Sequence, residues 1–362
     1  MDASLYHPTF ISIIATLCTV MVCRYISSPN YALQEQQQSL IAPLLISIVL
    51  IFWLGNRPLS GAYFGDTSNY ALSYKFFNGN SMTIDWSKEW VWQALMVICK
   101  KLSLDVSAFL TVIEAGYVLA VFFAVVKFLP NNPLIGMLFV WSSLMYFSFG
   151  VNGLRNGLAC HILLLALSFI LDSKYIIGTL LCLISFGIHK STMLPIAAIA
   201  TGFFFKDKVK YAIYIWVLSI PISLVAGSAA TAFFASLGFD DRMSSYTDNS
   251  VDMFSSSGFR WDFLLYSSFP VLMIWYICIK RKVSDSWYNV ISIVYCLCNA
   301  FWVLVIRAEY SNRFAYLSWF IYPIVIAYPL VNLPVWEDQD RKTGLILLAY
   351  CGFTVMMNTL YW

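Results

Sequence analysis

The chain has 362 residues, of which 60% are hydrophobic and only 11% are charged, and its formal net charge is +3. A soluble protein carries roughly 25% charged residues, and a soluble domain of this length could not bury so large an apolar share in one core. The composition therefore excludes an ordinary soluble protein, and the small net charge gives no sign of a nucleic-acid-binding tail.

Apolar runs of about 20 residues follow one another along the chain, separated by short polar breaks. Barrel strands would alternate in shorter blocks, and backbone groups in lipid must be paired within the segment, so these runs are predicted to be helices. We therefore expect an all-α, polytopic integral membrane protein with about twelve transmembrane helices in a single transmembrane domain, residues 1–362. The predicted spans are 8–26, 39–55, 105–127, 132–150, 154–171, 174–188, 190–205, 209–233, 261–280, 287–306, 314–332 and 343–361.

The N-terminal third allows two topologies. Its first run lacks a basic n-region and a small-residue cleavage motif, so it is interpreted as a retained helix. Residues 88–101 are short for a span and are interpreted as a re-entrant or interfacial helix, which makes 56–104 a periplasmic or re-entrant segment with an external N-terminus. If 88–101 crosses the membrane, both orientations reverse.

Basic residues set the orientation of the remaining chain, because Lys and Arg stay in cytoplasmic loops. Threading the predicted helices places all the basic clusters on one side: Lys206/Lys208/Lys210, Lys280/Arg281/Lys282, Arg341/Lys342, and the single Lys127 and Lys174. The opposite, external side then receives Arg155, His189, the periplasmic loop 234–260, and the group around Arg307.

Ionisable groups near membrane segments are candidates for function, because each costs at least ~2.5–3.5 kcal/mol at membrane depth. Arg155 stands between Asn152 and Asn156 in GVNGLRNGLACH. Its guanidinium suits phosphate oxygens, although an arginine that only reaches lipid headgroups is the alternative. His189, followed by Lys190, could accept a proton or orient a substrate, or could simply cap a helix end.

Two further segments carry candidates. Arg307, Glu309 and Arg313 in IRAEYSNRFAY form either a structural ion pair or an anion site with a carboxylate base. Asp66 and Tyr70 stand in FGDTSNYALSYKFF, where an aspartate is often only a helix cap. The long loop 234–260 is either a binding element or a solvated linker. An external cavity for an anionic lipid substrate would account for the Arg, His and Glu residues together.

No cofactor is expected. The nine cysteines are interpreted as apolar core residues, since none forms a CxxC motif or a Cys/His cluster, and no metal is predicted. The sequence has no P-loop, GxGxxG, HExxH or DxD motif, which argues against cytosolic nucleotide chemistry.

At these residues the sequence resembles the Wzy-type O-antigen polymerases, in particular the EpsG-like group of polysaccharide polymerases. The resemblance covers about residues 40–330 and rests on four short boxes in order along the chain. These are Gly65, Asp66 and Tyr70; Asn152, Arg155 and Ala159; His189 and Ser191; and Glu309, Arg313 and Phe314. Asn156 departs from the family pattern, which has Gln at that position.

The resemblance implies a GT-C-like membrane glycosyltransferase in the bacterial inner membrane, with its active site facing the periplasm. Its partners would be undecaprenyl-diphosphate-linked oligosaccharide units as donor and acceptor, membrane lipid and a chain-length regulator protein, with no nucleic acid. Arg155, Arg313 and Arg307 would bind the diphosphate, Glu309, His189 and Asp66 are the candidate catalytic bases, and Asn152, Asn156, Tyr70 and Lys190 would bind substrate.

Three other functions compete with the polymerase. An O-antigen ligase would share the donor but usually has a His in its large external loop, and 234–260 has none. A lipid-linked oligosaccharide flippase, which is a transporter, would place charges along a central pathway, often with internal symmetry. A membrane O-acyltransferase would carry its His deep in a helix.

Overall fold

The structure is a computed structural model that describes residues 1–27, 39–77, 84–236, 258–308 and 311–361. These ranges contain helices and turns and no strand, so the predicted all-α fold class is confirmed for them. The chain forms two compact units: unit 1 comprises Met1–His189 with Ala327–Trp362, and unit 2 comprises Lys190–Ile326. The predicted single transmembrane domain stays a prediction.

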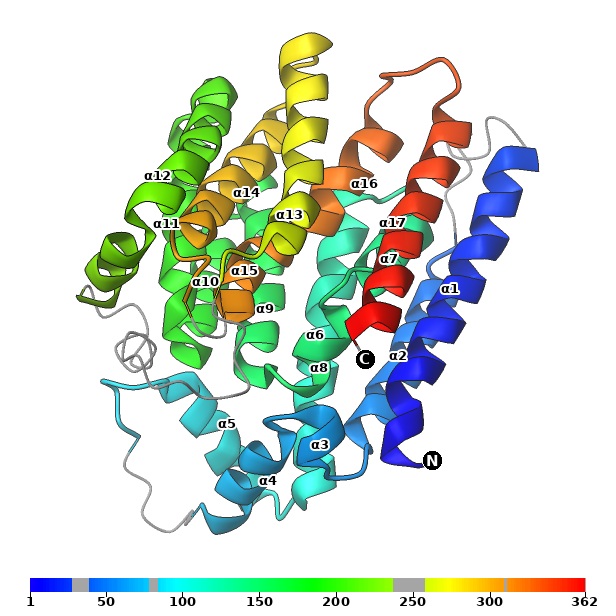
Figure 1. Cartoon of the computed structure of the whole chain (residues 1–362). Coiled ribbons are helices and arrows are strands. Elements are labelled where there is room, and N and C mark those ends of the chain that lie inside the picture. Colours follow the sequence, from blue (N-terminus) through cyan, green and yellow to red (C-terminus); the bar gives the residue numbers. More distant parts are fainter. Residues whose placement is uncertain (28–38, 78–83, 237–257, 309–310, 362) are drawn as a thin grey trace. The chain divides into compact units, whose positions relative to one another are not determined.

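Unit 1 contains α1 Ala3–Ser27, α2 Ile41–Gly55, α3 Gly61–Phe64, α4 Thr67–Phe76, α5 Trp90–Lys101, α6 Val106–Phe128, α7 Pro133–Trp141, α8 Tyr146–Val151, α9 Leu154–Leu171, α10 Tyr175–Ile188 and α17 Gln339–Tyr361. Helix α1 packs against α17, and α2, α6, α9 and α10 pack in sequence, each against the next. The short helices α3, α4 and α5 lie together at one end of this unit (Figure 1). They bring the polar residues of the segment 56–104 to that end.

Unit 2 contains η1 Lys190–Thr192, α11 Met193–Phe204, η2 Lys206–Lys208, α12 Val209–Ser236, α13 Trp261–Ile274, η3 Trp275–Lys280, α14 Ser286–Leu304 and α15 Ser311–Trp319, and α16 Tyr322–Asn332 continues into unit 1. The central helix of unit 2 is α14, which contacts α11, α12, α13 and α15. Buried Asn299 on α14 accepts a hydrogen bond from Trp216 Nε1 at 2.7 Å and donates to Ser318 Oγ at 2.9 Å and Ser267 Oγ at 3.2 Å. One amide thus links four helices in an apolar interior, where an unpaired polar group is costly.

Eight helices of the described ranges are long and apolar enough to cross a membrane. They are Ala3–Ser27, Val106–Phe128, Leu154–Leu171, Lys206–Gly227, Trp261–Lys280, Ser286–Leu304, Ser311–Asn332 and Gln339–Leu360. Two shorter apolar helices are Ile41–Gly55 and Tyr175–Ile188. The polytopic membrane class is therefore confirmed.

The two remaining predicted spans are made of shorter helices. The range 132–150 is divided between α7 and α8, with a break at residues 142–145 where the Ser142 hydroxyl donates to Leu138 O. The range 190–205 begins with the 3₁₀ turn η1, so α11 has only 12 residues. Such a helix rises about 18 Å, short of the roughly 30 Å of a bilayer core. Hydropathy did not reveal the break within 132–150, because Ser142 and Ser143 are not polar enough to interrupt an apolar run.

Helix α5 also has 12 residues, so it too falls short of a bilayer's thickness by about 12 Å. The assignment of 56–104 as a periplasmic or re-entrant segment stays a prediction.

The charged residues of unit 1 divide between its two ends. Lys127 Nζ lies 2.7 Å from Asp172 Oδ2, and Lys174 Nζ lies 3.2 Å from the same oxygen. Arg155 stands at the other end of α9, about 25 Å away at 1.5 Å per residue. Lys127 and Lys174 therefore share one end of unit 1, and Arg155 belongs to the other end.

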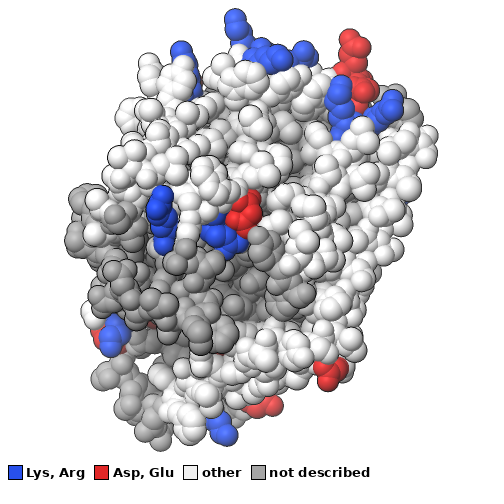
Figure 2. All heavy atoms as spheres, viewed as in Figure 1, with Lys and Arg blue, Asp and Glu red and all other residues white. Residues whose placement is uncertain are grey.

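In unit 2, basic side chains gather at the end where α12 begins and α13 finishes (Figure 2). The clusters there are Lys206/Lys208/Lys210 and Lys280/Arg281/Lys282, and η3, which leads into the second, contacts α12. The two clusters thus lie on one side of unit 2, which agrees with the arrangement predicted from the order of the helices in the sequence.

Candidate functional site

The candidate site of unit 1 lies on a buried apolar cluster built from α4, α5, α6, α9 and α10. Its members are Tyr74, Trp92, Met96, Cys99, Phe109, Leu110, Ile113, Leu154, Leu158, Ala159 and Ile188. The rings of Tyr74 and Phe109 stack with centroids 4.1 Å apart. Close packing of this kind fixes the helix ends that carry the polar residues.

Each polar residue of the site lies within three residues of a member of this cluster in the sequence. Arg155 follows Leu154, and His189 follows Ile188. Glu89 precedes α5 and stands three residues, about one helical turn, before Trp92. Burial of the apolar neighbours therefore positions the charged groups above them.

A close approach of α10 to α5 brings His189 to Glu89. At Gly187 an added Cβ would lie 2.4 Å from Val91 Cγ2 and 2.7 Å from Trp90 Cε2. Only glycine fits this contact unless the Val91 and Trp90 side chains shift. The residue two positions later, His189, is thereby held against the start of α5.

Glu89 joins Arg155 and His189. Its Oε2 accepts a hydrogen bond from Arg155 Nη1, and its Oε1 lies 2.6 Å from His189 Nδ1. The three side chains keep 18%, 20% and 17% of their surface exposed, in the order Glu89, Arg155, His189. They are therefore shielded and paired, yet open to a ligand.

The charges around Glu89 keep its carboxylate ionised. Burial by itself raises the pKa of Glu89, but the hydrogen bond and charge of His189 and those of Arg155 together outweigh it, so that the pKa lies below its ordinary value. Glu89 also occupies the N-cap position of α5 without a side-chain capping hydrogen bond, and the helix dipole there favours a negative charge.

Tyr70 completes the environment of Arg155. Its hydroxyl lies 3.4 Å from Arg155 Nε, and the guanidinium carbon is 5.6 Å from the centre of the Tyr70 ring. The Tyr70 ring packs edge-on against Trp92 at 5.5 Å. Arg155 Nη2 forms no hydrogen bond within the described part of the chain, so this nitrogen can bind an anion.

Two sequence-distant motifs meet at Gly65 and Asn152. The backbone N–H of Asp66 donates to Asn152 Oδ1 at 2.8 Å. Gly65 has φ +50°, and a Cβ at this position would lie 2.4 Å from Asn152 Oδ1. Glycine is therefore required both by backbone conformation and by space. The Asp66 carboxylate accepts from Asn69 Nδ2 at 3.1 Å.

A fully buried ion pair supports this junction. Arg57 Nη1 lies 2.7 Å from Glu114 Oε1, with both side chains at 0% exposure. Arg57 Nη2 also donates to Thr67 Oγ1 at 3.0 Å, and the Thr67 hydroxyl donates to Val151 O. Thr67 and Val151 are the direct chain neighbours of Asp66 and Asn152, so the pair anchors both halves of the motif contact.

Asn156 and Lys190 differ from the residues above. Asn156 is buried in α9, only 7% exposed, and its Oδ1 accepts from Cys160 Sγ at 3.2 Å. Lys190 opens η1, the first element of unit 2. The substrate-binding roles expected of both residues stay predictions.

The remaining candidates belong to unit 2. Arg307 is exposed after the end of α14, with its guanidinium carbon 5.9 Å from the Phe259 ring centre. Arg313 is partly buried near the start of α15. Glu309 and most of the loop 234–260 lie outside the described residues.

Sequence reasoning missed Glu89, the residue that links Arg155 to His189. Its signal was a carboxylate directly before the apolar helix WVWQALMVICKK, in a segment interpreted only for its length. Glu114, a lone carboxylate inside a membrane run, was also missed, although its cost at membrane depth would have marked it.

Within the described ranges, no group of three His, Cys, Asp or Glu side chains is arranged to hold a metal ion. The expectation that no cofactor is used stays a prediction.

Comparison with known protein families matches residues 40–361 to the EpsG family. Searches among curated proteins and among solved structures returned no match. The family match extends over most of the chain and includes every box on which the sequence resemblance rests. The chain is therefore a multi-pass membrane protein that belongs to the EpsG family, the polysaccharide-polymerase-like group that its motifs indicate.

Proposed function

We propose that this protein is a polymerase of lipid-linked oligosaccharide repeat units, which works on undecaprenyl-diphosphate-linked substrates at the periplasmic face of the bacterial inner membrane. The observation that carries the proposal is the Glu89–Arg155–His189 cluster at the end of unit 1 remote from Lys127 and Lys174. Family membership supports the reaction class.

The proposed reaction transfers the glycan of one repeat unit to a hydroxyl of another. The acceptor oxygen attacks the anomeric carbon, and the bond between that carbon and the diphosphate oxygen breaks. The acceptor proton passes to a base of the protein, and the bonding electron pair leaves with the lipid diphosphate. No metal takes part, because guanidinium groups stabilise the leaving charge.

Arg155 is the proposed diphosphate ligand. Its contacts to Glu89 and Tyr70 orient the guanidinium before substrate arrives, and a preorganised charge loses little energy in reorganisation. Because Nη2 has no partner among the described residues, a phosphate oxygen can bind there without displacing Glu89. Arg313 and Arg307 remain the proposed further diphosphate ligands.

His189, positioned by Glu89, is the base that the geometry favours. A carboxylate 2.6 Å from Nδ1 favours the tautomer with its proton on Nδ1, which leaves the basic lone pair on Nε2. Asp66 and Glu309 remain the alternative bases. Asn152 acts indirectly, since it holds Asp66 through the backbone.

The test uses a strain from which the gene is deleted, with the surface glycan separated on a gel. We expect caps of a single repeat unit and no ladder, and we expect the wild-type gene to restore the ladder. Arg155→Ala should not restore it at normal protein level, whereas Lys174→Gln, an exposed change at the opposite end of unit 1, should.

Two results would contradict the proposal. A normal ladder from Arg155→Ala would remove the diphosphate role of this residue. Complete loss of glycan from the lipid core in the deletion strain would indicate a ligase or a flippase instead.

A further inference from the structure

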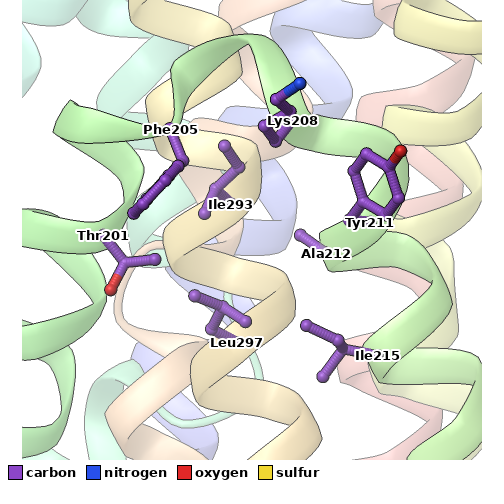
Figure 3. A pocket seen from close by; sticks show the side chains of 8 residues that line it. All are labelled: Thr201, Phe205, Lys208, Tyr211, Ala212, Ile215, Ile293 and Leu297. Carbon is purple, nitrogen blue, oxygen red and sulfur yellow. The ribbon is translucent and has the colours of Figure 1, made fainter.

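A groove in unit 2 lies apart from the residues of the proposed reaction. It has a volume of about 380 Å³ and lies between α11 and α12 against α14. Its lining residues are Thr201, Phe205, Lys208, Tyr211, Ala212, Ile215, Ile293 and Leu297. Figure 3 shows Lys208 at the end where α11 turns into α12, and Leu297 and Ile215 at the other end.

The groove is apolar along its length. Ala212 and Ile293 form a buried floor, whereas Phe205, Tyr211 and Ile215 are 56%, 60% and 49% exposed. The Thr201 hydroxyl donates a hydrogen bond to Ala197 O of its own helix at 2.9 Å. The end of the groove away from Lys208 can therefore contact an acyl chain through apolar groups, and the Thr201 hydroxyl that lines the groove is already hydrogen-bonded.

The mouth of the groove carries a positive charge. Lys208 is exposed and forms no ion pair within the described part of the chain, and its ammonium lies 5.9 Å from the centre of the Tyr211 ring. Lys206 and Lys210 stand two residues before and after it, with Asp207 between Lys206 and Lys208, so the segment 206–210 keeps a net positive charge. Lys208 ends η2, and from there to Ile215 the chain rises about 10 Å along α12, so the charge lies at one end of the apolar groove.

We propose that this groove binds one anionic phospholipid of the surrounding bilayer, with its phosphate at Lys208 and one acyl chain along α12 and α14. The shape fits an amphiphile with a single negative end, and charge complementarity selects an anionic headgroup. Basic pockets between transmembrane helices on the cytoplasmic side bind such headgroups, and the positive-inside rule predicts that side for Lys206–Lys210. The proposal is independent of the proposed polymerase reaction.

The test measures binding of phosphatidylglycerol and phosphatidylcholine to the full chain, purified in detergent, by native mass spectrometry. We expect the first phosphatidylglycerol to bind about fivefold more tightly than phosphatidylcholine, from one lysine contact at the membrane surface. Lys208→Gln should abolish the preference. Lys210→Gln is the matched control, because it removes the same charge from the same cluster without altering the groove lining.

A second variant tests the acyl-chain site. Ala212→Leu fills the groove at its floor and should weaken the binding of both lipids. Its unfolding midpoint, measured in detergent without added lipid, should equal that of the wild type, which shows that the variant is folded. If Lys208→Gln and Lys210→Gln reduce the preference for phosphatidylglycerol equally, the proposal is overturned in favour of a diffuse surface charge. Unchanged lipid affinity in Ala212→Leu would overturn it too, as would displacement of the lipid by an equal concentration of inorganic phosphate.

Discussion

Glu89 accepts hydrogen bonds from both Arg155 and His189, which come from the start of α9 and the end of α10. A group shared in this way couples the two functions proposed for the site, diphosphate binding and proton acceptance. Removing the carboxylate leaves a partly buried guanidinium without its partner and frees the imidazole to rotate. The effect of Glu89 on the reaction is therefore expected to depend on His189.

A double-mutant cycle measures this dependence. We expect Glu89→Gln and His189→Ala each to slow polymer synthesis about 100-fold in membranes, and the double variant to be little slower than either, because both changes remove one base. The readout is the rate of ladder formation from purified lipid-linked repeat units. A large loss in Asp66→Asn with a near-normal Glu89→Gln would assign the proton to Asp66 instead.

The pH dependence of stability tests the electrostatics of Glu89. Its pKa is lowered in the folded protein, so its contribution to stability is complete above the unfolded value of about 4.3 and is lost as the pH falls through the lower, folded value. The unfolding midpoint of wild type should exceed that of Glu89→Gln by a constant amount from pH 8 to about pH 5. The gap should close in more acidic solution. A gap that closes near neutral pH would mean that burial raises the pKa of Glu89 more than His189 and Arg155 lower it.

The turn between α3 and α4 contacts Asn152, and this contact depends on Gly65. Gly65→Ala places a Cβ 2.4 Å from Asn152 Oδ1 on a backbone with φ +50°. We expect a loss of about 1–3 kcal/mol from backbone conformation alone, seen as a lower unfolding midpoint, and a weaker ladder as Asp66 moves. Gly352→Ala, where an added Cβ meets nothing within 4 Å, is the control.

A second substitution separates the steric cost of Gly65→Ala from its cost in backbone conformation. Asn152→Ala in the Gly65→Ala background removes the atom in contact and should recover part of the stability, though not the hydrogen bond to Asp66. If Gly65→Ala alone leaves the midpoint unchanged, the two motifs do not meet as described.

For the whole molecule, the distribution of charge predicts which surfaces face each compartment. Single cysteines at the exposed positions 69 and 174, in a variant without the exposed Cys23, should react from opposite sides with a membrane-impermeant maleimide. Positions 174 and 208 should be labelled only after lysis, since both lie at basic ends. Labelling of position 69 only after lysis would place the proposed site on the cytoplasmic face.

Much of the membrane fold could be predicted from the sequence because lipid imposes one requirement on every span, internal pairing of the backbone within about 20 apolar residues. The range 154–171 coincides with α9 for this reason. The break at 142–145 could not be predicted, because hydropathy does not detect a helix that ends in the protein interior, where α7 is buried.

The sequence by itself determined the class of protein, through its apolar runs, and the family, through four short motifs. It also predicted Arg155 and His189 as site residues, because a charged or polar residue beside an apolar run is costly and so stands out, and Asp66 and Tyr70 through their motif. Only the tertiary structure decided that Glu89 joins Arg155 to His189 and that Asn152 requires Gly65. Both contacts span more than 60 residues. The first arises from the packing of α5, α9 and α10 on one apolar cluster, and the second lies beside the buried Arg57–Glu114 pair, which holds Thr67 and Val151 together. Hydropathy and short motifs report local composition, whereas such contacts follow from how helix ends pack in space.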